Sequence, residues 1–191
     1  MSDKTSKEKI LKEAQKLFAE HGYFAVSMSE IASKAGMTKS NLYHHFKNKD
    51  DLYEQLLKRT FTQLKNYMDS YSGLFEEGAF DIAFKKLLED YIKFGIKNKD
   101  IIYILLQQIS RLDKKIQLFI YDSKKEIASL FEVYLQEGIK RGEIKKSLDP
   151  KKSAKLLLGL LHMTILQQTQ LKTSTKSSIS ETTEEIYKWL I

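Results

Sequence analysis

The chain of 191 residues contains no cysteine, one proline and eight glycines. Without cysteine, disulfides, thiolate metal ligands and cysteine nucleophiles are excluded, which fits a reducing compartment. So few proline and glycine residues interrupt regular structure only rarely, and no short segments alternate regularly between apolar and polar residues. The sequence therefore predicts an all-α protein.

Long apolar segments are also missing. The N-terminal residues 1–5 lack the apolar core of a signal peptide, and the longest central apolar run, residues 101–106, is far too short to span a bilayer. A protein acting on membrane surfaces would need a lysine-rich face opposite a continuous apolar face, whereas the clearest apolar stripes here are typical of a core. We expect a soluble, cytoplasmic protein with no membrane partner.

Catalytic and metal-binding patterns are absent too. The four histidines, His21, His44, His45 and His162, are scattered, and no paired Glu-x-x-His motifs indicate a di-metal helix bundle. Adjacent histidines point to different sides of a helix, so His44 and His45 are a poor metal pair. We expect no enzyme activity, no metal and no cofactor.

What the chain does have is positive charge and helical periodicity. Its net charge is +7, and 42% of its residues are hydrophobic, enough for a real core. A basic balance favours a polyanionic partner, either nucleic acid or an anionic membrane surface. Capping residues and apolar spacing together predict about nine helices.

Residues 27–49 carry the pattern that suggests a function. Ser27 and Glu30 form a capping box for one short helix, and Thr38 caps a second one directly after the tight turn at residues 35–38. Two short helices joined in this way predict a helix-turn-helix, whose second helix enters the DNA major groove. The segment holds four lysines and one acid, Glu30, as DNA binding requires.

The stretch from Ile10 to Leu56 resembles the N-terminal domain of the TetR family of bacterial repressors. The matching features are the Ala14, Leu17, Phe18 and Gly22 spacing, Ile31-Ala32, Ala35-Gly36-Met37-Thr38, Leu42-Tyr43-His44-His45-Phe46, and Lys49 followed by Leu52. The resemblance covers about a quarter of the chain. It implies a nine-helix subunit, a dimer formed through the last two long helices, and a small-molecule pocket in the body.

The resemblance also assigns DNA-contacting residues by position. Phosphate-contacting positions are matched by Ser27, Thr38, Tyr43 and Lys49. Groove-facing positions are matched by Lys39, Asn41 and His44, with Ser40 standing where the family often has glycine. Asparagine pairs geometrically with adenine, although Asn41 binding only a phosphate or water is the alternative.

The rest of the chain is expected to sense a ligand and to dimerise. We predict a helix-turn-helix domain at residues 1–50 and a helical ligand-binding and dimerisation domain at residues 51–191. A minority of the body's aromatic and polar residues are candidates for a pocket, the alternative being a core role: Tyr91, Tyr103, Gln107, Phe131, Tyr134 and His162. Candidates for the dimer interface are Leu157, Leu161, Ile165 and Trp189.

The predicted function is a ligand-responsive transcriptional regulator. We expect a homodimeric repressor that binds a pseudo-palindromic operator in double-stranded DNA and is released by a small, largely apolar effector. Activation instead of repression is left open, as are the effector's identity, the operator sequence and the pocket residues that contact the effector.

Overall fold

The computed structural model describes residues 3–73, 80–103, 109–171 and 176–191. Within these ranges the chain is helical, without strands, which confirms the predicted all-α class. The N-terminal head consists of α1 (Asp3–His21), α2 (Met28–Lys34) and α3 (Lys39–His45). The body contains α4 (Lys49–Asp69), α6 (Phe80–Lys97), α7 (Lys99–Tyr103), the 3-10 helix η2 (Ile109–Arg111), α8 (Lys114–Arg141), α9 (Pro150–Leu171) and α10 (Lys176–Leu190).

The helix starts follow the predicted caps. The Ser27 side chain accepts from the Glu30 amide while Glu30 accepts from the Ser27 amide, so the capping box is reciprocal. Thr38 caps α3 by accepting from the Asn41 amide, and Asn48 caps α4 by accepting from the Asp51 amide, without a reciprocal bond. Asp149 accepts from the Lys152 amide at 3.0 Å, and Pro150 takes the first position of α9. These local interactions mark where α2, α3, α4 and α9 begin.

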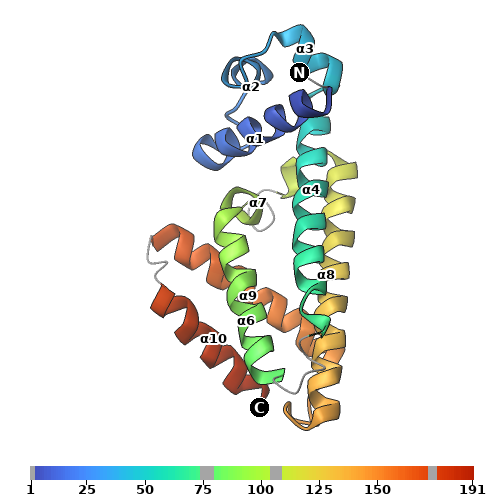
Figure 1. Cartoon of the computed structure of the whole chain (residues 1–191), viewed down its shortest axis with the longest axis vertical. Helices are drawn as coiled ribbons and strands as arrows, with labels where there is room; N and C mark the ends of the chain where they lie inside the picture. The colour runs from blue at the N-terminus through green and yellow to red at the C-terminus, as the bar shows by residue number, and fades with distance from the viewer. Residues whose placement is uncertain (1–2, 74–79, 104–108, 172–175) are drawn as a thin grey trace.

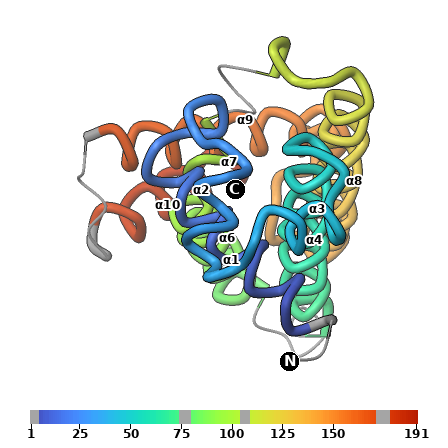
Figure 2. The backbone as a smooth tube through the Cα atoms, turned by 90° about the horizontal axis from the view of Figure 1, so that it is seen from above, coloured from blue at the N-terminus to red at the C-terminus, as the bar shows by residue number. Residues whose placement is uncertain are grey.

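The head sits at one end of an elongated body, and α4 connects the two (Figure 1). This helix leaves the head and runs down the body beside α8, as both views show (Figures 1 and 2). The predicted domain boundary at residues 50 and 51 lies inside the first turn of α4, which continues unbroken across it. Head and body are therefore joined by one continuous helix.

The core of the body is built around α9, which packs most extensively against α6 and α8, whereas α4 meets its neighbours over fewer residues. Gly95 of α6 lies so close to α9 that an added Cβ would be 2.2 Å from Ile165 Cδ1. The two helices α6 and α9 are thus packed so closely at this point that no larger side chain fits between them.

The structure corrects three of the four residues predicted for the dimer interface. Leu157, Leu161 and Ile165 are completely buried within the subunit, so they cannot form the surface at which two subunits meet. The exposed apolar residues of α9 are instead Leu156, Leu160 and Met163. Their spacing of four and three residues places them on one face of the helix.

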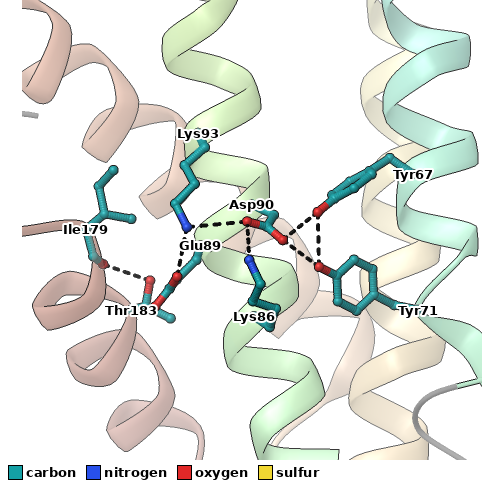
Figure 3. A network of polar contacts seen from close by, with 8 residues as sticks. All are labelled: Tyr67, Tyr71, Lys86, Glu89, Asp90, Lys93, Ile179 and Thr183. Carbon is teal, nitrogen blue, oxygen red and sulfur yellow. Dashed lines mark hydrogen bonds and ion pairs between the residues drawn. The ribbon is translucent and has the colours of Figure 1, made fainter. Parts of the chain in front are cut away.

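The C-terminal end of α4 is tied to α6 by a polar network (Figure 3). Asp90 of α6 accepts hydrogen bonds from the hydroxyls of Tyr67 and Tyr71, the latter at 2.6 Å, and pairs with Lys86 at 2.7 Å. These donors lower the pKa of Asp90 to about 2, against the effect of its burial. A second tie is the hydrogen bond of 2.9 Å from the Tyr134 hydroxyl to the Met68 carbonyl.

Candidate DNA interface and effector cavity

The helix-turn-helix is formed by α2, α3 and the turn between them. Ala35 ends α2, and Gly36 follows with φ of +64°, a conformation that residues with a Cβ rarely adopt. The Met37 amide then donates to the Ala32 carbonyl at 2.9 Å and closes the turn. This geometry sets the angle at which α3 leaves α2.

The α3 helix presents its polar side chains to solvent. Leu42 and Phe46 point inward and are buried, whereas Tyr43 is 51% exposed. The other predicted DNA-contacting residues of this region are also exposed: Ser27, Thr38, Lys39, Ser40, Asn41 and His44. His45 is half-buried beside the Phe46 ring. The side chains predicted to contact DNA therefore lie outside the core of the head and are accessible to a partner.

Lys49 has an internal role that sequence reasoning missed. Its ammonium donates to the carbonyls of Tyr23 at 2.9 Å and Val26 at 3.0 Å, and it lies 4.5 Å from the centre of the Tyr23 ring. Partial burial lowers the pKa of Lys49. The Tyr23 hydroxyl in turn donates to Asp50. These contacts hold the loop between α1 and α2 against the start of α4, and phosphate contact by Lys49 stays a prediction.

The body contains a small cavity of about 30 Å³ between its helices. Its walls come from α4, α6, α7, α8 and α9 and are almost wholly apolar. The volume admits at most a few water molecules. Tyr91 and His162, two of the predicted pocket residues, line it.

His162 is held in the cavity wall by Tyr91. Its Nε2 lies 3.0 Å from the Tyr91 hydroxyl, and both side chains are buried. Burial, helped by the nearby charge of Lys124, lowers the pKa of His162 to about 4. The ring is therefore neutral at physiological pH and forms one polar spot in an apolar wall.

The other predicted pocket residues lie elsewhere. Phe131 is buried in the core against the Tyr91 ring, and Tyr134 bonds to the end of α4 as described above. Tyr103 lines a separate cleft of about 460 Å³ where the head meets the body. Gln107 falls outside the described residues.

Direct contacts join the head to the body beside α4. Gln15 of α1 donates to the Asn98 side chain at 2.7 Å, at the end of α6. Arg59 of α4 pairs with Glu8 of α1 at 2.6 Å. The Arg111 guanidinium lies 3.9 Å from the centre of the Phe24 ring. The two residues of each pair are far apart in the sequence, so no local sequence pattern predicts these contacts.

An exposed helix-turn-helix on a helical body with a cavity between its helices defines a class of protein, the DNA-binding regulators with a sensor domain. Residues 10–56 match the family described as bacterial regulatory proteins, tetR family, and residues 83–166 match the tetracyclin repressor-like C-terminal domain. The chain belongs to the TetR family of transcriptional regulators.

Similar proteins include a regulator of fatty acid metabolism and a transcriptional repressor. The fatty acid metabolism regulator protein of Bacillus subtilis is 23% identical over 156 residues, covering 82% of this chain and 79% of the relative. The transcriptional repressor KstR2 of Mycolicibacterium smegmatis is 26% identical over 150 residues, covering 75% of this chain and 69% of the relative.

Solved structures share the fold. The transcriptional regulator FadR from Bacillus subtilis in complex with stearoyl-CoA superposes with a TM-score of 0.75 at 19% identity, covering 95% of both chains. Among the described residues, no helix is long and apolar enough to cross a membrane.

Proposed function

We propose that the protein is a dimeric repressor that binds a pseudo-palindromic operator and is released by an effector with a long apolar chain. The observation that carries this proposal is an exposed recognition helix joined by a single helix, α4, to an apolar cavity. Lipid-metabolism regulators among the relatives, one of them bound to stearoyl-CoA, favour a fatty acyl chain as the apolar part.

The size of the cavity supports a coupled mechanism. About 30 Å³ is far too little for an acyl chain, so binding must push the surrounding helices apart. The α6–α9 contact at Gly95 and Ile165 has no slack, whereas α4 contributes Thr60, Phe61 and Leu64 to the wall and is less tightly packed. We therefore expect α4 to be the helix that moves when an acyl chain enters the cavity.

Movement of α4 reaches the head because its far end is fixed. The Asp90 network and the Tyr134 bond hold the helix near Met68. Phe61 lies about 10 Å from that anchor along the helix axis and Lys49 about 28 Å from it, so a tilt is enlarged roughly threefold at the head. The effector must bind the tilted state more tightly, and a coupling of about 1–3 kcal/mol is typical.

The effector is tested by competition on DNA. In a shift assay with the DNA beside the protein's own gene, stearoyl-CoA should weaken binding about 5- to 150-fold, the range expected for such coupling. Thermal unfolding with and without stearoyl-CoA checks that the ligand binds the folded protein. A protein that holds its DNA equally well at saturating stearoyl-CoA and shows no thermal shift would lack this effector, while the DNA-binding role would stand.

The DNA-contacting residues are tested by separating affinity from specificity. Asn41→Ala should relax the preference for one base by about 1–3 kcal/mol if the amide reads that base. Tyr43→Phe should weaken all sequences alike by roughly 1 kcal/mol per half-site, through loss of one hydrogen bond to phosphate. Binding of each variant to operators with every base substituted in turn measures the difference. A uniform loss in Asn41→Ala would show that Asn41 does not read a base.

A further inference from the structure

An open groove of about 410 Å³ lies on the surface between α4 and α8. Phe61 of α4 and Ile127 of α8 line both this groove and the small cavity. The two helices run side by side along the body (Figures 1 and 2). These two side chains therefore form a partition that the cavity and the groove share.

An aromatic contact stabilises the partition. The Phe61 ring meets the edge of Phe119, with centroids 5.8 Å apart and planes at 78°. Phe119 lines the groove but not the cavity, and both rings are half-buried. Rotation of Phe61 away from Phe119 would connect the two spaces, and it breaks a contact of about 0.5–1.5 kcal/mol, which corresponds to roughly a two- to tenfold factor in rate.

The groove outside the partition is polar. Lys58 and Lys65 of α4 line it, and each is ion-paired, Lys58 with Glu54 at 2.7 Å and Lys65 with Glu126 at 3.2 Å. Both lysines are about half exposed. The Lys65–Glu126 pair is exposed on both sides and contributes little to stability, so Lys65 can turn to an incoming anion at small cost. Lys58 is paired with the buried Glu54. Glu54 would keep its second partner, Lys115, at 2.9 Å.

We propose that the groove is the entrance and the head-group site for an amphiphilic effector, with Phe61 as the gate. The apolar chain passes between Phe61 and Ile127 into the cavity, and its anionic head stays outside against Lys58 and Lys65. This inference rests on the proposed function and adds the route by which the effector enters and the chemistry of the effector's head group. Because Phe61 is on α4, entry of the effector's apolar chain displaces the helix that carries the DNA-binding head.

The gate is tested by association kinetics. Stearate and stearoyl-CoA are mixed with the full-length protein, and the rate of binding is followed by stopped-flow displacement of a fluorescent fatty acid. Phe119→Ala should raise the association rate roughly two- to tenfold, because the ring that holds Phe61 in place is gone. Tyr121→Ala is the matched control, since Tyr121 is on the same helix, is exposed, and lines neither space. Phe119→Leu tests the same point if the alanine variant unfolds.

The head-group site is tested by charge removal. Lys58→Gln/Lys65→Gln should weaken both anionic ligands and leave stearyl alcohol unchanged, while Lys151→Gln/Lys152→Gln on the exposed start of α9 should change none of them. A larger loss for stearoyl-CoA than for stearate identifies a phosphorylated carrier as the natural head, and an equal loss identifies the carboxylate of a free acid.

The outcomes separate the two proposals. If the wild-type protein binds these ligands but Phe119→Ala associates no faster than Tyr121→Ala and the lysine variant binds all ligands normally, the chain enters elsewhere and this inference is wrong, while the effector proposal stands. If the wild-type protein binds none of the three ligands, both the entrance and the acyl effector are overturned.

Discussion

Replacing Leu160 with aspartate should disrupt the proposed dimer, leaving monomers, and lower operator affinity about 10²- to 10⁴-fold. Leu156, Leu160 and Met163 form an exposed apolar stripe on α9, with 60%, 46% and 49% of their surface accessible. A charge at its centre would have to be buried between two subunits without a partner. The loss in affinity follows because two linked heads gain about that factor in avidity over one head.

Sedimentation and a shift assay on the full operator measure the two effects. Ile82→Asp is the control. Ile82 is an apolar residue that is 67% exposed, but it is on α6 and not on the α9 stripe. Both substitutions are at exposed positions, so the subunit itself should fold normally. A Leu160→Asp protein that sediments as a dimer would place the interface on another surface.

The head could be predicted from the sequence because its determinants are local. Ser27 and Glu30 are three residues apart and bond each other, Thr38 caps the next helix, and Gly36 supplies the left-handed turn between them. None of these interactions depends on a distant part of the chain. Lys49 is the exception, because its acceptors lie at Tyr23 and Val26, across a loop whose path the sequence does not specify.

The body was harder to predict because its helices are apolar on more than one face. In α9 the residues at 156 and 160 repeat with the same spacing as those at 157 and 161, so periodicity cannot tell which stripe is internal. Only the packing against α6 and α8 places the second pair inside. Tyr134 is a pocket candidate because tyrosine combines an apolar ring with a polar tip, and in the structure that tip donates to the Met68 carbonyl at the end of α4.

Asp100 is a second feature that only the fold exposes. This residue in the first turn of α7 is 6% accessible, and within the described parts of the chain neither of its carboxylate oxygens has a hydrogen-bond partner of good geometry. Burial raises the pKa of Asp100 to about 6, and neighbouring backbone amides and Lys99 only partly oppose this effect. A buried carboxylate whose charge is only partly compensated destabilises the folded state wherever it is charged.

Asp100→Asn should therefore stabilise the protein by about 2 kcal/mol at pH 7.5. The shift of the pKa from 3.8 to about 6 sets an upper limit of about 3 kcal/mol, and the buried amide retains part of the cost. In a protein of this size the melting temperature should rise by roughly 4–8 °C. Urea unfolding measures the difference, and Asp122→Asn, at an exposed position on α8, is the control.

The pH dependence of this difference identifies its cause. A carboxyl whose pKa is higher in the folded state stabilises the fold below pH 4, and that stability is lost as the pH rises through about 6. His162 acts in the opposite direction, because its folded pKa of about 4 means that stability is lost as the pH falls below 6.5. The two effects offset each other in the wild-type curve, so only the difference between Asp100→Asn and wild type isolates Asp100. This difference should be largest above pH 6 and should disappear near pH 4; a constant difference across that range would mean that the carboxylate charge is not its source.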